Sequence, residues 1–223
     1  MKGPAINYCF LLLMVCLTQA NAQNITRIDS LRKNLPGVSG VEKFNLLNDL
    51  GFEYRLSYPD STIYYCLQAY ALGQQLKVPK ELSKPLSFIG LANAYKGDYK
   101  ASFDYHLKSV EVAQEQEDST QLAFCYNNFG RLFFDQGDLT RAYDNLIKSM
   151  VIFEKLNDPV GLAYVYRSLT NIHKSQQDYA KALEMAQKAY QLRKQIGDPR
   201  GLLSALIELG AVYSEMKSAL DAN

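Results

Sequence analysis

The chain has 223 residues, with 48% hydrophobic and 21% charged side chains and a net charge of +1 at neutral pH. Only Lys2 is charged among the first 22 residues, so the rest of the chain carries 23 basic and 23 acidic side chains. This balance disfavours nucleic acid and anionic membranes as partners, because proteins that bind either one usually carry an excess of basic residues.

The first segment, residues 1–22, is predicted to be a secretory signal peptide. Lys2 supplies a positive charge, residues 8–17 form an apolar run, and Ala20 and Ala22 flank a cleavage point. The apolar run is shorter than a membrane span, which needs about 20 residues, and we expect no span in the mature chain. An exported protein, periplasmic or otherwise extracytoplasmic, is therefore expected. Lipid attachment at Cys16 is less favoured, because Val15 stands where a small residue is needed.

Residues 23–40 are expected to form a short capping helix followed by a linker. The apolar residues of this segment have helical spacing, at Ile25, Ile28, Leu31 and Leu35. Pro36 would end this helix, and Ser39 with Glu42 predicts a capping box at the start of the next one.

From residue 41 onward the sequence repeats with a step of 40 residues. The repeated columns hold small residues and aspartates: Gly90, Gly130, Thr170 and Gly210; Ser102, Ala142 and Ala182; Asp98, Asp138 and Asp178; Asp118, Asp158 and Asp198. A period of 20 to 50 residues indicates one supersecondary unit stacked on copies of itself. The predicted units are residues 41–79, 80–118, 119–158, 159–198 and a partial unit 199–223.

Each unit contains two stretches of helical periodicity and no sustained alternation, which predicts an all-α fold. The two stretches are separated by a turn such as Gly137-Asp138, and Asp138 and Asp158 are expected N-caps of the helices that follow. Pro159 fits the first turn of such a helix. The small residues Gly130 and Ala142 would let the paired helices approach each other closely.

These patterns resemble the tetratricopeptide repeat. The residues that carry the resemblance are Leu209-Gly210 with Tyr213, Phe129-Gly130 with Phe133, Gly97-Asp98-Tyr99 with Ser102, and Asp178-Tyr179-Ala180-Lys181-Ala182. The resemblance covers residue 41 to the end, with a step longer than the usual 34 residues. It implies a right-handed α-solenoid of antiparallel helix pairs, whose first helices line a concave groove that binds proteins or peptides without catalysis.

An export signal before such repeats also resembles the extracytoplasmic input region of bacterial sensor kinases. The partial last unit stops where a second helix would pack, so we expect a longer natural product, a signalling protein whose missing region could tether it to a membrane. The alternative is a freestanding periplasmic or secreted adaptor that holds an envelope assembly.

The family geometry implies which first-helix side chains face the groove. They are Lys84, Phe88, Phe124, Asn127, Asn128, Arg131, Tyr164, Arg167, Asn171 and Lys174. Guanidinium groups bind carboxylates bidentately and amides can hold a peptide backbone, so we expect a protein or peptide ligand, for which an acidic segment is one candidate. The alternative is a solvated polar face, whose charges pair with neighbours such as Asp135 and Glu208.

Catalytic or metal chemistry is not expected. His106 and His173 lie in different units without partners at metal or triad spacing, and we interpret them as packing residues, as we do Cys66 and Cys125. The sequence contains no phosphate loop, nucleophile elbow or dinucleotide fingerprint. We therefore expect neither an enzyme nor a bound cofactor.

Overall fold

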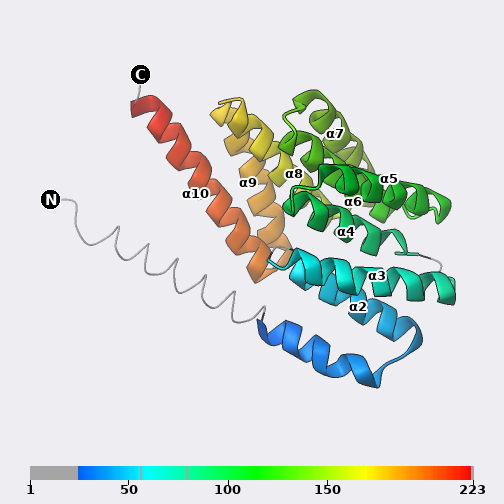
Figure 1. The fold of residues 1–223 in the computed structure, drawn as a ribbon. Helices are drawn as coiled ribbons and strands as arrows, with labels where there is room; N and C mark the ends of the chain where they lie inside the picture. The colour runs from blue at the N-terminus through cyan, green and yellow to red at the C-terminus, as the bar shows by residue number, and fades with distance from the viewer. Residues whose placement is uncertain (1–24, 56, 79, 222–223) are drawn as a thin grey trace.

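A computed structural model describes residues 25–55, 57–78 and 80–221, so the predicted signal peptide lies outside the described residues. Every regular element in the described part is helical (Figure 1). Residues 25–34 form the first helix, and the 3-10 helix η1 (Leu35–Gly37) follows it. Ile28 is buried, and Leu35 packs beside Phe44 of the next helix.

The remaining helices form antiparallel pairs. The pairs are α2 (Gly40–Tyr54) with α3 (Pro59–Leu76), α4 (Ser83–Tyr95) with α5 (Tyr99–Glu115), α6 (Ser119–Asp135) with α7 (Leu139–Leu156), and α8 (Pro159–Ser175) with α9 (Tyr179–Ile196). The last helix, α10 (Pro199–Asp221), packs on α9. The first helices α2, α4, α6, α8 and α10 also contact one another in order, so they form the inner layer of an all-α solenoid (Figure 1).

Aspartates start most of these helices. The carboxylate of Asp138 accepts a hydrogen bond of 2.9 Å from the backbone N–H of Arg141, and Asp158 accepts two from the first turn of α8. The predicted Ser39–Glu42 capping box is wrong, because the Ser39 side chain makes no capping hydrogen bond. Gly40 follows it with φ +58°, so the backbone leaves the helical path that would bring an N–H to the Ser39 hydroxyl.

Small residues set the contact between paired helices. A Cβ atom added to Gly130 would lie 2.7 Å from Leu146 Cδ2 and 3.1 Å from the Ala142 carbonyl oxygen. One unit earlier, a Cβ on Gly90 would lie 2.7 Å from the ring of His106. Glycine therefore occurs where the facing helix carries a large side chain.

Serines strengthen the same contacts. The hydroxyl of Ser109 donates to the Ser83 carbonyl at 2.8 Å, and the hydroxyl of Ser149 donates to the Ala123 carbonyl at 2.7 Å. Both bonds link the second helix of a unit to its first helix in the same register. Among the described helices, none is both long enough and apolar enough to cross a membrane.

Candidate peptide-binding groove

The inner layer contains two adjoining hollows. The larger, of about 290 Å³, is lined by the end of α2 and by parts of α8, α9 and α10; the smaller, of about 130 Å³, is lined mainly by α6 and α8. Arg55, Tyr164 and Arg167 line both. We call the two hollows together the inner groove. Their volumes suit a few side chains of a bound segment rather than a folded domain.

Three arginines, Arg55, Arg131 and Arg167, line the smaller hollow. No carboxylate of the described residues forms an ion pair with any of them. Arg131 Nη2 donates to the Tyr95 hydroxyl at 3.3 Å, while Arg167 is exposed and has no polar partner in the described part of the chain. We call these three residues the arginine trio.

Arg55 is the most enclosed member of the trio. Its guanidinium stacks on the Phe52 ring, 3.4 Å from the centroid, and donates to the Phe52 carbonyl oxygen. Burial lowers the pKa of Arg55, yet an arginine remains protonated in a protein. The hollow thus contains a partly desolvated positive charge without a direct carboxylate partner.

Acidic and amide groups complete the smaller hollow. Asp135 is its one carboxylate among the described residues, and burial raises the pKa of Asp135 while the Arg131 charge lowers it. The Asn127 side chain is buried and accepts a hydrogen bond of 3.1 Å from the Ser168 hydroxyl. Asn171 lines the same wall. The hollow offers more positive than negative charge, together with amides that can bind a peptide backbone.

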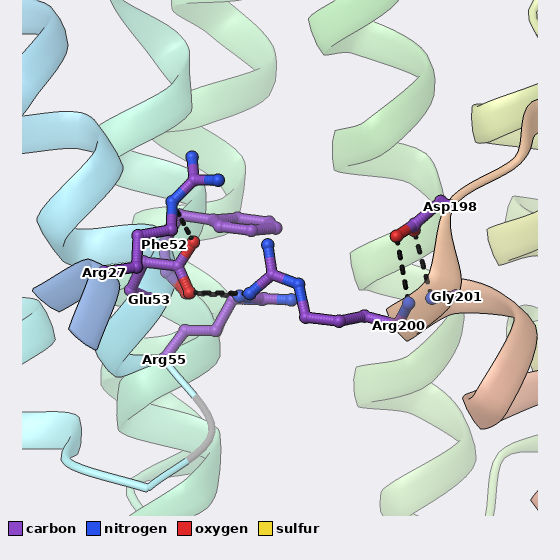
Figure 2. A network of polar contacts seen from close by, with 7 residues as sticks. All are labelled: Arg27, Phe52, Glu53, Arg55, Asp198, Arg200 and Gly201. Atoms are coloured by element: carbon purple, nitrogen blue, oxygen red, sulfur yellow. Dashed lines mark hydrogen bonds and ion pairs between the residues drawn. The ribbon is translucent and has the colours of Figure 1, made fainter. Parts of the chain in front are cut away.

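An ionic contact lies at the edge of the larger hollow, whose lining includes Glu53 and Arg200 (Figure 2). The Glu53 carboxylate, only 2% exposed, lies 2.8 Å from Arg27 Nε and 3.1 Å from Arg200 Nη1. Asp198 positions Arg200, because its carboxylate accepts hydrogen bonds from the backbone N–H groups of Arg200 and Gly201. We call the Arg27–Glu53–Arg200 contact the Glu53 latch. It joins α2 to the start of α10, 147 residues later in the chain.

The other predicted groove residues lie outside the smaller hollow and have partners. Lys84 pairs with Glu81, Phe88 packs on Phe52, Asn128 donates to Ser87, Phe124 packs on Phe153, and Lys174 pairs with Glu208 and Glu215. Lys174 therefore pairs with neighbouring carboxylates, as the alternative interpretation of the polar face expected. Only Asn127, Arg131, Tyr164, Arg167 and Asn171 meet in one hollow.

Arg55 was missed from the sequence, although a signal was present. It lies four residues after Gly51, just as Lys174 lies four residues after Thr170 of the same small-residue column. The first unit is one residue shorter than the others, which hides this register. The Glu53 latch has no such signal, because no column relates Glu53 to Arg200.

Both histidines are buried packing residues. The His106 ring lies 5.6 Å from the Phe129 ring, and burial lowers the pKa of His106 to about 3. Cys66 and Cys125 are buried free thiols whose pKa values are raised by burial. Across the described ranges, no group of three or more His, Cys, Asp or Glu side chains is placed to hold a metal ion.

Solved structures with similar folds are helical-repeat proteins. A Rap protein complexed with competence and sporulation factor has a TM-score of 0.71 and 19% identity over 92% of this chain and 62% of the Rap chain. BtubC from P. vanneervenii has a TM-score of 0.59 and 19% identity over 90% of this chain and 87% of the BtubC chain. Aspartyl phosphate phosphatase F from Bacillus subtilis has a TM-score of 0.56 and 14% identity over 95% of this chain and 61% of the phosphatase chain.

These likenesses show the fold alone. This chain spans less than two thirds of the Rap and phosphatase chains. A search of curated proteins gave no match. The sequence profile of the tetratricopeptide repeat, a repeat family rather than an enzyme family, matches residues 81–155 and 126–195, which together cover more than half of the chain. The chain therefore belongs to the tetratricopeptide repeat family.

Proposed function

We propose that this protein is a binding scaffold that holds an extended acidic segment of a partner protein in its inner groove. The observation that carries the proposal is the arginine trio, whose members line one hollow without an ion-paired carboxylate. Arg55 is partly desolvated, and removing a guanidinium group from water is costly unless an anion and hydrogen bonds compensate for the lost hydration. A bound carboxylate would supply that compensation, since arginine binds it bidentately.

The groove also fits the backbone of such a segment. Asn127 and Asn171 line the hollow beside the trio, and Tyr164 forms a wall shared with the larger hollow. The Rap protein, whose fold is similar, was solved in complex with competence and sporulation factor. That complex supports ligand binding by a solenoid of this shape, while the acidic chemistry rests on the trio in this chain.

The place of action belongs to the same proposal. Residues 1–22 have the features of a secretory signal, so the scaffold would act outside the cytoplasm, as the sensing region of a larger signalling protein. A freestanding periplasmic or secreted adaptor remains the alternative. An immunoblot of cell fractions with antibody raised against residues 25–221 tests both. A large membrane-bound product is expected for a sensor, a small extracytoplasmic one for an adaptor, and a cytoplasmic product would refute export.

Binding is tested with two fluorescein-labelled decapeptides that differ only in four glutamates replaced by glutamines. We expect tighter anisotropy binding of the glutamate peptide, because a hydrogen bond to a charged group contributes about 1.5 to 3 kcal/mol. Arg167→Ala should weaken it about tenfold, which corresponds to about 1.4 kcal/mol. Arg141→Ala is the matched control, since Arg141 is an exposed arginine of α7 that does not line the groove. Equal affinities for both peptides would refute the acidic specificity.

A further inference from the structure

Arg193 occupies a position that the preceding unit fills with phenylalanine. It lies 40 residues after Phe153, on the second helix of the next unit, and both residues are buried. The Phe153 ring packs on the Phe124 ring, with 4.8 Å between their centroids. Forty residues later, the Arg193 guanidinium lies over the Tyr164 ring, 4.5 Å from its centroid. The repeat therefore keeps this packing arrangement and replaces one aromatic ring with a charged group.

The glycine that faces this position repeats as well. A Cβ atom added to Gly161 would meet the Phe153 ring, and one added to Gly201 would lie 2.6 Å from Arg193 Cδ. Because the surroundings match, packing alone does not require an arginine in the later unit. Burying a charge costs free energy that a phenylalanine would not cost. Departures of this kind from the local rules are typical of functional positions.

The hydrogen-bond donors of Arg193 lack acceptors. Among the described residues, only Asp198 forms an ion pair with Arg193, and its Oδ2 lies 3.7 Å from Arg193 Nη1. This separation is too long for a hydrogen bond, and the same oxygen accepts the Gly201 backbone N–H at 3.0 Å. No other group in the described part of the chain accepts a hydrogen bond from the Arg193 side chain. The residue is only 8% exposed, so its guanidinium has little water in place of the missing acceptors.

Arg193 lines the larger hollow of the inner groove, as does Arg167. Each carboxylate that lines this hollow in the described chain already has another partner. Glu53 belongs to the latch, Asp198 accepts backbone N–H groups of α10, and Glu208 pairs with a lysine of α8. The arrangement leaves Arg167 and Arg193 available to an anion from outside the described chain.

The geometry of the groove limits where such an anion would lie in a bound segment. The two hollows adjoin and share Arg55, Tyr164 and Arg167. Small side chains leave room in the larger hollow, at Ala163, Ala186, Ala189 and Ala205. Side chains two positions apart in an extended segment point to the same side, about 7 Å from each other. Adjoining hollows on one inner surface therefore suit two side chains at this spacing.

We propose that Arg193 binds a second carboxylate of the ligand in the larger hollow. This inference rests on the proposed function and narrows the ligand to an extended segment with two acidic side chains, two positions apart. One side chain enters the smaller hollow against the arginine trio, and the other meets Arg193 and Arg167. The second carboxylate supplies the acceptor that Arg193 lacks, through charge-assisted hydrogen bonds.

The test compares fluorescein-labelled decapeptides that differ only in their glutamates, with glutamine at the replaced positions. One has no glutamate, one has a single glutamate, one has two glutamates two positions apart, and one has two adjacent glutamates. Each is titrated with the full chain and followed by anisotropy. We expect the spaced second glutamate to tighten binding about tenfold, a factor equal to about 1.4 kcal/mol. The peptide with adjacent glutamates should bind like the single-glutamate peptide, because adjacent side chains point to opposite sides of an extended segment.

Arg193→Phe separates ligand binding from packing. It restores the residue of the preceding unit, so the variant should keep the parent's melting temperature while losing the gain from the spaced second glutamate. Arg193→Gln, which keeps an unbranched stem beside Tyr164, should lose the same gain. Lys194→Gln is the matched control, since it removes a positive charge from an exposed position of α9 outside the hollow and should keep the gain.

The outcomes distinguish this inference from the proposed function. An equal gain from the spaced glutamate in the parent and in both Arg193 variants would overturn the inference and leave the proposed function standing. A gain from adjacent glutamates as large as that from spaced ones would overturn the placement of one carboxylate in each hollow. If the single-glutamate peptide binds no better than the peptide without glutamate, the proposed function fails and this inference fails with it.

Discussion

Two glycines of one repeat column should respond in opposite ways to the same substitution. Gly130→Ala places a Cβ atom 2.7 Å from Leu146 Cδ2 and 3.1 Å from the Ala142 carbonyl oxygen. Leu146 is 1% exposed within the main core cluster, so it has little room to move. Gly210→Ala places the same atom in open space. The helix register is the same, and only the facing helix differs.

The magnitudes follow from two effects. Alanine is more favourable than glycine inside a helix by about 0.8 to 1 kcal/mol, and this gain applies at both positions. Overpacking in a filled core costs about 1 to 3 kcal/mol, and this loss applies only at Gly130. We therefore expect Gly210→Ala to stabilise the protein by about 1 kcal/mol and the two variants to differ by about 1 to 3 kcal/mol.

Urea unfolding followed by circular dichroism measures both free energies of unfolding. A difference of 1 kcal/mol should also separate the melting temperatures by about 2 to 4 °C in a chain of this size. Equal stabilisation by Gly130→Ala and Gly210→Ala would refute the close contact of α6 with α7. Equal destabilisation would refute the open face of α10.

Three further predictions concern stability. Burial holds the pKa of His106 at about 3, below its ordinary value of about 6.5, so on acidification the unfolded chain is protonated at this histidine before the folded chain is. The free energy of unfolding should therefore fall as the pH decreases from about 6.5 toward 3, by up to about 1.4 kcal/mol per pH unit. Urea titrations of His106→Leu should show a smaller dependence on pH. Glu53→Gln should lower the free energy of unfolding by about 1 to 3 kcal/mol, less than the loss of a partner in a fully buried ion pair, because the arginines that contact Glu53 are partly exposed. The same substitution should speed hydrogen exchange at the start of α10, and unchanged exchange would contradict a latch that holds α10. Asp138→Ala should lower the melting temperature, because the backbone N–H of Arg141 loses its capping partner, whereas Asp104→Ala, an exposed change within α5, should not.

The helix pairs could be predicted from the sequence because each unit repeats its own local rules. Asp138 and Asp158 cap helices as their spacing indicates, and the small residue at Gly130 marks where α6 meets α7. These contacts join neighbours in the chain, so a column of residues contains the required information. The failure at Ser39 arose from backbone geometry at Gly40, which side-chain pattern alone does not reveal.

The inner groove was harder to predict, because it depends on how small rotations between units accumulate. Arg131 and Arg167 lie on adjacent first helices, and the family geometry places them on one side. Arg55 of the first unit lines the same hollow as Arg131 and Arg167, and Glu53 contacts Arg200 of α10. Both contacts require the curvature of the superhelix to bring the first unit close to the last two. Lys174 was a candidate ligand contact, with pairing to neighbours such as Glu208 as the alternative, and α10 brings Glu208 and Glu215 against it.

The most direct test of the binding proposal is the affinity of the glutamate decapeptide for Arg55→Ala. Arg55 belongs to the first unit but lines the hollow formed by α6 and α8, so its contribution requires both the closed superhelix and an acidic ligand in the inner groove. We predict about tenfold weaker binding of the glutamate peptide, equal to about 1.4 kcal/mol, with no change for the glutamine peptide. Unchanged affinity for the glutamate peptide would contradict the arginine trio as the binding site.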